Sequence, residues 1–201
     1  MKNYIDPPKA KPVLDSGKRT EFSTGAVRDM HTGKGRNDLI PPRIAYHLLE
    51  VKEDPSNPSM EAHTIGALYA YWCMKNEVVT SRLNLLRECF VRCCYVIVDK
   101  NHSGAALTRL QVINIGLDRL AKLYEKGAEK YGELNWTKGI PSSSFYDSAH
   151  RHMRKHLLGQ DDEDHLAAFL FNVVGLMYNE RHHPDLVVLH ECFVEGSVSN
   201  A

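Results

Sequence analysis

Acidic side chains gather in two segments of the second half of the chain. Glu125 and Glu129 lie in "LYEKGAEKYGELNW", and Glu163 and Asp164 lie in "DEDHLAAFLFN". Residues four apart share one face of a helix, so the first pair projects together. Carboxylates that converge from two helices can hold Mg²⁺ for phosphate chemistry. The pattern predicts metal ligands at Glu125, Glu129, Glu163 and Asp164, and catalytic roles for all of them except Glu163.

Each acidic segment also has a structural interpretation. Neighbouring lysines, among them Lys126, could neutralise a solvated helix face, and acids at a helix start favour the helix dipole. Asn135 and Trp136 follow the first segment after one turn. A solvated helix end rarely needs a tryptophan, whereas an aromatic face can support a base or a sugar. We therefore expect Asn135 and Trp136 to border a nucleotide, with Lys126 near its phosphates.

Polar residues also occur inside the apolar segment that follows Asp164. His165 and Asn172 are seven residues apart, so they share a face of a helix whose other residues are mostly apolar. Buried polar groups need hydrogen-bond partners. The metal-holding carboxylates are the most economical partners, which would make both residues supports for the metal ligands. A core histidine with ordinary partners explains His165 equally well.

Cationic residues lie between the acidic segments and in the N-terminal region. His152 and His156 have a spacing that could bind zinc, but there is no HExxH pattern and no third ligand follows nearby. Phosphate contacts by Arg151 and His152, or simple surface charge, are favoured over zinc. The glycine-bearing "TGKGR" could bring Lys34 and Arg36 to phosphates, although it lacks the spacing of a P-loop. The alternative is that this N-terminal segment is a leader that forms no functional site.

Composition excludes several classes of protein. The chain has 201 residues with 25 basic and 25 acidic side chains, which gives no overall attraction to nucleic acid or anionic membranes. No run of eighteen apolar residues suggests a membrane span, and the N-terminus shows no signal-peptide core. Five cysteines without a CxxC pair are typical of reduced, buried thiols. We expect a cytoplasmic protein.

Helical patterns dominate the chain beyond its first forty residues. The proline- and glycine-bearing residues 1–41 predict an extended arm, residues 42–183 an all-α domain, and residues 184–201 a tail. Helices are expected to run from Ser103 to Gly132, from a Ser144–Asp147 capping box to Gly159, and from the acids at 161–164 to Glu180. Two apolar helices at 59–76 and 80–101 would cover each other most easily in a homodimer or homotetramer.

Several of these segments resemble a known family. The motifs "TGAVRD…TGKGRNDLIPP", "LAKLYEKGAEKYGELNWTKGIP", "RHMRKHLLG" and "DEDHLAAFLFNV" look like those of the MazG-like dATP/dGTP diphosphohydrolases of bacteriophages. The resemblance covers residues 24–45 and 117–180, and residues 48–114 look like an inserted helical pair. It implies an all-α bundle that uses Mg²⁺ or Mn²⁺ to split purine deoxynucleoside triphosphates, dGTP and dATP, into monophosphate and pyrophosphate. Some phage members are thought to supply dGMP for 2-aminoadenine DNA.

The chain departs from the wider superfamily in its acidic spacing. That superfamily pairs glutamates on one helix with an E-x-x-D pair on the next, whereas Glu163 and Asp164 are adjacent here. Two alternatives stay open. A non-enzymatic helical interaction module would use the acids only for solvation and capping. An HD-type phosphohydrolase requires the order His-Asp, whereas this chain has Asp164 before His165.

Overall fold

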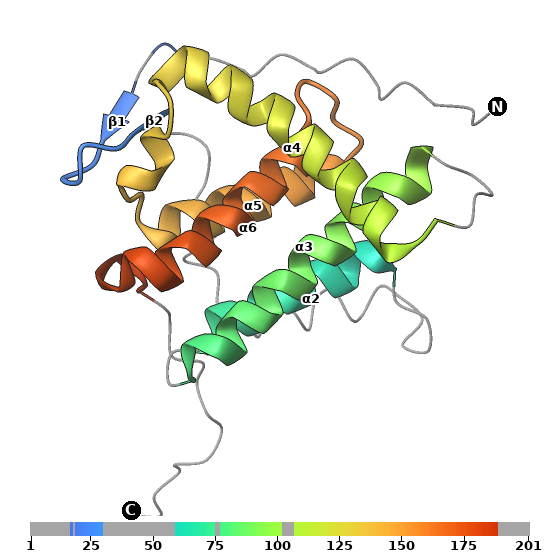
Figure 1. Ribbon diagram of the computed structural model, residues 1–201. Coiled ribbons are helices and arrows are strands. Elements are labelled where there is room, and N and C mark those ends of the chain that lie inside the picture. Colours follow the sequence, from blue (N-terminus) through green and yellow to red (C-terminus); the bar gives the residue numbers. More distant parts are fainter. Residues whose placement is uncertain (1–16, 18, 30–58, 75–76, 102–106, 189–201) are drawn as a thin grey trace, which may run out of the picture.

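The computed structural model describes residues 17, 19–29, 59–74, 77–101 and 107–188, and it confirms the all-α class (Figure 1). Strands occur in the described residues as one short hairpin. The elements are β1 Arg19–Glu21, β2 Val27–Asp29, α2 Met60–Trp72, α3 Val79–Asn101, α4 Arg109–Tyr131, η2 Asn135–Lys138, α5 Ser142–Leu157, α6 His165–His182 and η3 Pro184–Leu186. Residues 42–58 of the predicted all-α domain lie outside the described residues.

Helices α5 and α6 lie side by side at the centre of the bundle (Figure 1). Helix α4 packs on α6 from one side, while α3 contacts α6 and α4 and carries α2 against its other face. The close approach of α5 to α6 depends on Gly175, because a Cβ at that position would overlap the Phe145 ring. This packing fixes the facing surfaces of α4, α5 and α6.

The helix ends follow local backbone chemistry. Helix α4 begins after Thr108, whose side chain forms a reciprocal capping box with Gln111, so the predicted start near Ser103 was too early. It ends at Gly132, as predicted, where φ is 86° and a glycine is favoured. The predicted capping box at Ser144 is wrong, since α5 already begins at Ser142. Helix α6 begins after its N-cap, Asp164.

Part of the predicted extended arm is a packed hairpin. Strands β1 and β2 pair antiparallel, and Gly25 takes a positive φ of 76° in the turn between them. Ala26 is fully buried, and the Thr24 hydroxyl donates to the carbonyl of Gly139. Asn135 clamps β2 by accepting from the Val27 amide at 3.2 Å and donating to its carbonyl at 2.8 Å. These contacts fix β2 against the end of α4.

The apolar surfaces of α2 and α3 are covered within one chain. The two helices pack on each other, and Tyr71 and Trp72 are fully buried against the rest of the bundle. Intrachain packing therefore accounts for the apolar faces from which an oligomer was predicted. The three cysteines of α3 are buried free thiols, as expected, but Cys73 is disulfide-bonded, which contradicts the expectation for that residue. Within the described residues no helix is long and apolar enough to cross a membrane.

Candidate active site

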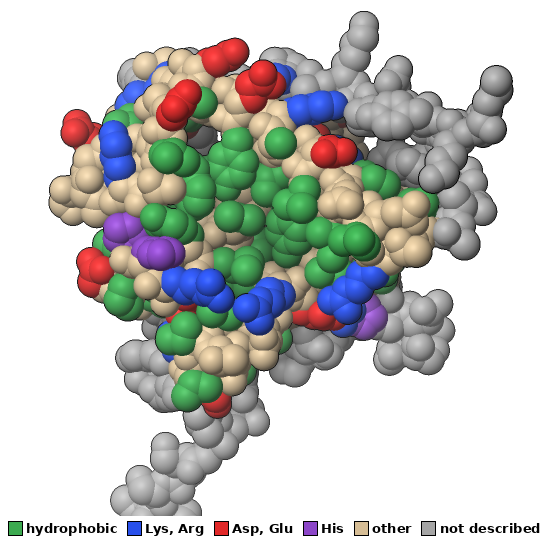
Figure 2. Space-filling view, in the orientation of Figure 1, with side chains coloured by type: hydrophobic (Ala, Val, Ile, Leu, Met, Phe, Trp, Pro, Cys, Tyr) green, Lys and Arg blue, Asp and Glu red, His purple; other side chains and the backbone are tan. Residues whose placement is uncertain are grey.

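A cavity of about 1270 Å³ opens between β2, the second half of α4, the turn after α4, α5 and the start of α6. Figure 2 shows hydrophobic side chains gathered on one face of the bundle, below α4. The volume lies above the usual range for small-molecule pockets. The lining includes both apolar and cationic side chains, which suits an amphipathic ligand.

Aromatic rings form one wall of the cavity. Trp136 packs edge-on against Tyr178 with ring centroids 4.9 Å apart, and its centroid lies 5.5 Å from that of Tyr124. Phe171 of α6 completes the group at 5.5 Å from Tyr124. Trp136, Tyr124 and Phe171 all line the cavity. Trp136 therefore packs against the core and also presents part of its surface to the cavity, where it was predicted to border a base or sugar.

A buried arginine from the hairpin forms part of the opposite wall. Arg28 donates to the Asn172 side-chain oxygen at 2.8 Å and to the Ser144 carbonyl at 3.0 Å, and its guanidinium lies over the Phe145 ring. Burial, and then the neighbouring charge of Arg151, lowers the pKa of Arg28 to about 10. The guanidinium still carries its charge at neutral pH, so β2 brings a fixed cation into the cavity wall.

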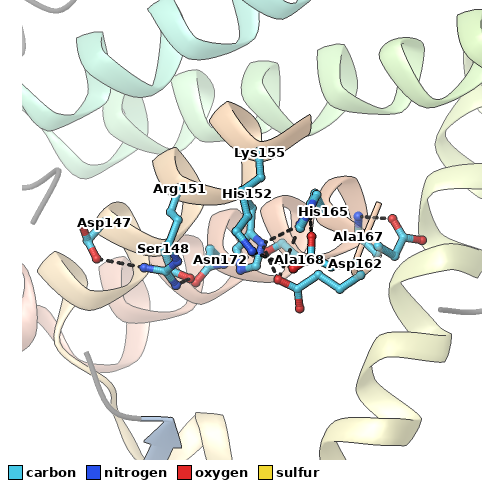
Figure 3. Close-up of polar contacts among 12 residues, drawn as sticks. Asp147, Ser148, Arg151, His152, Lys155, Asp162, His165, Ala167, Ala168 and Asn172 are labelled. Carbon is cyan, nitrogen blue, oxygen red and sulfur yellow. Dashed lines mark hydrogen bonds and ion pairs between the residues drawn. The ribbon is translucent and has the colours of Figure 1, made fainter. Parts of the chain in front are cut away.

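Further cations project from α5 into the same wall. Arg151 donates to the buried Asp147 carboxylate at 3.1 Å and to the Ser148 hydroxyl at 2.8 Å (Figure 3). Burial lowers the pKa of Arg151, and the Asp147 charge partly offsets this effect. Arg154 and Lys155 line the cavity one turn further along α5, where Arg154 is exposed. The cationic edge of the cavity is thus formed by Arg28, Arg151, Arg154 and Lys155.

Two histidines and a glutamate meet where α5 turns into α6. His152 of α5 and His165 of α6 face each other with their Nδ1 atoms 3.3 Å apart (Figure 3). The Oε1 atom of Glu163 lies 3.2 Å from the Nδ1 of His152 and 3.5 Å from the Nδ1 of His165. We call these three residues the His–Glu cluster. His152 and Glu163 also line the cavity.

The charges of the His–Glu cluster depend on one another. Burial lowers the pKa of His152, although the hydrogen bond with Glu163 works against this effect. Burial alone would raise the pKa of Glu163, but the hydrogen bond from His152 and the charges of both histidines outweigh it, so the pKa lies below its usual value. Glu163 is therefore ionised at neutral pH, beside a largely neutral His152.

The four predicted metal ligands are distributed differently from the sequence prediction. Glu125 lines the cavity and Glu129 does not, although both are exposed on α4. Glu163 lies in the His–Glu cluster. Among the described residues, the His–Glu cluster is the group of histidine, cysteine or carboxylate side chains that lie close enough to share one ion. Glu125, Glu129 and Asp164 do not belong to such a group among the described residues, and their predicted role as ligands of Mg²⁺ or Mn²⁺ stays a prediction.

Asp164 is held in a structural arrangement. Its Oδ1 accepts from the Ala167 amide at 3.0 Å and from Nη2 of Arg119 at 2.6 Å. Its Oδ2 accepts from Nε of Arg119 at 2.8 Å. The carboxylate thus caps α6 and ties it to α4, because its oxygens point at that junction. The predicted role of Asp164 as a metal ligand beside Glu125 stays a prediction.

The remaining predicted site residues also find specific neighbours. The Asn172 side chain accepts from Arg28 and donates to the Ala168 carbonyl at 2.6 Å, so its partner is a cation where a metal-binding carboxylate was expected. The Asn135 amide lines the cavity, but both of its ends bond the backbone of β2. Lys126 lies on α4 beside the cavity-lining residues without lining the cavity itself. The predicted phosphate contacts Lys34 and Arg36 lie outside the described residues.

Sequence reasoning missed several contributors. Arg28, Tyr124 and Phe171 line the cavity but were not among the predicted site residues. A signal was available for Arg28, because Asn172 on an apolar helix required a polar partner. The pairing of Arg119 with Asp164 had no comparable signal, since the two residues are 45 positions apart on different helices.

Comparison with known proteins agrees with this placement of the cavity. Residues 99–187 match the family model described as dATP/dGTP diphosphohydrolase, N-terminal. The matched region runs from α3 to η3 and holds every cavity-lining residue except those of β2. No curated protein and no solved structure matches the chain. The match confirms the resemblance that the motifs predicted: over residues 99–187 the chain is similar to the N-terminal region of dATP/dGTP diphosphohydrolases.

Proposed function

We propose that this protein hydrolyses purine deoxynucleoside triphosphates, dGTP and dATP, to the monophosphate and pyrophosphate, and that the cavity is its substrate site. One observation carries the proposal: within the family-matched region, an aromatic wall and a cationic edge face the same cavity. The family model describes the N-terminal region of such enzymes, so we propose, for this chain, the activity of the whole enzyme.

The cationic edge is suited to a triphosphate. Arg28 and Arg151 are fixed by their hydrogen bonds, while Arg154 and Lys155 lie further toward solvent. Arginine binds phosphate oxygens through two parallel N–H groups, and fixed guanidinium groups lose little entropy on binding. A charge-assisted contact of this kind contributes about 1.5–3 kcal/mol. Arg151 and Lys155 also pair with Asp147 and Asp162, so part of their charge is already balanced by protein carboxylates.

The aromatic wall is suited to a base. A purine can lie against the exposed part of Trp136, and Phe171 extends the apolar surface beneath it. The Tyr124 hydroxyl is buried and has no hydrogen-bond partner among the described residues. Burial raises the pKa of Tyr124, so the hydroxyl keeps its proton and can donate to a base nitrogen or oxygen. Base recognition in this proposal therefore comes from Trp136 and Tyr124.

Hydrolysis requires an attacking water and a proton acceptor. Glu125 is the predicted catalytic residue that lines the cavity, and its exposed carboxylate can accept the proton of a water there. The water oxygen bonds to the α-phosphorus, the bond from that phosphorus to the bridging oxygen breaks, and pyrophosphate leaves. The predicted Mg²⁺ or Mn²⁺ enters this proposal as part of the metal–nucleotide substrate. A dGMP product would fit the predicted role in 2-aminoadenine DNA synthesis.

Product analysis tests the class of reaction and the bond together. The full chain is incubated with each of dATP, dGTP, dCTP and dTTP plus Mg²⁺ or Mn²⁺, and the products are separated by ion-exchange chromatography. We expect monophosphate and pyrophosphate, with purines preferred. Triphosphate or phosphate as the product would support an HD-type reaction, and no turnover of any nucleotide would favour the interaction module.

A matched pair of variants tests the cavity as the substrate site. Arg154 is an exposed arginine that lines the cavity, whereas Arg181 is an exposed arginine of α6 outside it. Loss of one phosphate contact should lower kcat/KM of Arg154→Met roughly ten- to a hundredfold. Arg181→Met should stay close to the wild type. Equal behaviour of the two variants would remove Arg154 from the phosphate site.

A further inference from the structure

We propose that the His–Glu cluster is a binding site for one late first-row divalent ion of the Zn²⁺ or Co²⁺ kind. The ligand atoms would be Nδ1 of His152, Nδ1 of His165 and Oε1 of Glu163. This set differs from the all-carboxylate Mg²⁺ site predicted from the sequence, and it lies at the α5–α6 turn rather than between α4 and α6.

The spacing of the three atoms is that of a tetrahedral site. An ion with bonds of about 2.0–2.1 Å holds its tetrahedral ligands about 3.3–3.4 Å apart. The three observed separations are 3.2 Å, 3.3 Å and 3.5 Å. The cluster is also sheltered, since the His165 side chain is 2% exposed and that of Glu163 is 15% exposed. The ligand atoms need to move little to accept an ion.

Neighbouring groups orient His165 for this role. Its Nε2 lies 2.8 Å from Oδ1 of Asp162, and the other oxygen of Asp162 accepts from Lys155 at 2.8 Å (Figure 3). Asp162 accepts from Lys155 through one oxygen and faces the imidazole with the other, so the His165 ring donates to it from Nε2. In the neutral ring Nδ1 then carries a lone pair. Histidine ligands in metal sites are held in the same way, with the second nitrogen donating to a carboxylate.

The arrangement leaves an excess of acceptors around one point. Nδ1 of His165 lies 3.5 Å from Oε1 of Glu163, and both atoms face Nδ1 of His152. Two acceptors at such a distance repel unless a proton or a cation lies between them. A metal ion satisfies all three lone pairs together.

The donor set determines the class of ion. Imidazole nitrogens suit Zn²⁺, Co²⁺ and their neighbours, whereas Mg²⁺ prefers oxygen ligands in an octahedral arrangement. His152 and Glu163 line the cavity, so a remaining coordination position would face the space proposed for the phosphates. A role for the bound ion in hydrolysis rests on the proposed function. Binding of the ion to the cluster is independent of that function.

Titration of the metal-free, untagged full chain with Co²⁺ and Zn²⁺ tests the site without nucleotide. We expect one ion per chain by calorimetry, and for Co²⁺ the intense visible absorption of four-coordinate geometry. Glu163→Gln and His152→Gln should each weaken binding roughly a hundredfold or more, because each removes a ligand. His63→Gln is the matched control, since His63 is an exposed histidine of α2.

A second pair of variants separates ligand loss from misfolding. Asp162→Asn leaves all three ligands in place and removes only the carboxylate that orients His165, so affinity should fall about 10- to 100-fold. Asp185→Asn, a change at an exposed aspartate of η3, should leave affinity unchanged. Circular dichroism and the melting temperature of each metal-free variant verify that it is folded.

Two outcomes overturn the site. One is the absence of stoichiometric binding by the wild type; the other is wild-type affinity in folded Glu163→Gln and His152→Gln. These results leave the proposed function untouched, because nucleotide hydrolysis with Mg²⁺ is measured separately. Conversely, an ion bound at the His–Glu cluster without any nucleotide hydrolysis would refute the proposed function and leave the metal site standing.

Discussion

Replacement of Asp164 by alanine should destabilise the protein and spare its activity. The carboxylate caps α6 through the Ala167 amide, and loss of such a cap costs about 1 kcal/mol. It also forms a two-point pair with Arg119, in which the side chains are 17% and 20% exposed. A pair of this partial burial contributes about 1–2 kcal/mol, between the values of surface and buried pairs. We expect Asp164→Ala to lose about 2–3 kcal/mol of unfolding free energy.

Urea unfolding followed by circular dichroism measures this loss, which corresponds to a melting temperature about 5–10 °C lower for a chain of this size. Arg119→Leu removes the pair and keeps the cap, so it should cost less than Asp164→Ala. The double variant gives the coupling energy of the pair, expected at about 1–2 kcal/mol. Asp185→Ala, at an exposed acid of η3, should change neither stability nor turnover.

Turnover measured well below the melting temperature decides the role of Asp164. We expect kcat of Asp164→Ala within about threefold of the wild type, because both carboxylate oxygens are already bonded to protein donors. A variant with wild-type stability and a hundredfold lower kcat would refute this reasoning and return Asp164 to the catalytic group that the sequence predicted.

Three further predictions concern the cavity and its surroundings. Glu125→Gln should lower kcat about 10²- to 10⁴-fold as a lost proton acceptor, while Glu129→Gln, one turn along α4 and outside the cavity, should stay within twofold or so; similar losses in both would argue against the cavity. Trp136→Ala should change the ranking of kcat/KM among the four nucleotides, and equal slowing of all four would identify Trp136 as packing alone. Burial lowers the pKa of His150 to about 3 from 6.5, so its contribution to stability is complete above pH 6.5 and is lost as the pH falls toward 3. Urea unfolding between about pH 7.5 and about pH 5 should show a loss of about 2 kcal/mol from this residue, absent in His150→Gln; equal slopes for the two proteins would show that His150 is charged in the folded state.

Helix ends were predicted best where one residue type has a strong backbone preference. Gly132 and Gly159 both take positive φ values at helix ends, and both were recognised as stops. Helix starts were predicted less well, because serine, threonine and aspartate are common and any of them can cap. Thr108 with Gln111 formed the actual capping box, while the Ser144–Asp147 pair lies inside α5. There Asp147 is buried and bonds Arg151 instead of a backbone amide.

The acidic ligands show what a helical pattern leaves undetermined. Glu163 and Asp164 are adjacent and both precede the first residue of α6, so helical periodicity does not determine which of them faces the cavity. No sequence pattern distinguishes the two acids, because the deciding partner, Arg119, lies on another helix. Once Arg119 holds Asp164, Glu163 is left to face His152 and the cavity. The contact with Arg119 thus gives Asp164 a structural role and leaves Glu163 at the candidate site.

The His–Glu cluster illustrates the opposite case, in which residues close in sequence form a site that no regular motif describes. Zinc was set aside because His152 and His156 lacked a third ligand at a recognised spacing. The turn at Gly159 folds α5 back on α6, so His152 meets Glu163 and His165 instead of acting with His156. Motif spacings assume one helix, whereas these ligands come from both sides of a helix–helix turn. When a histidine lies near a turn between two helices, possible metal ligands should therefore be sought on the next helix as well as on its own helix.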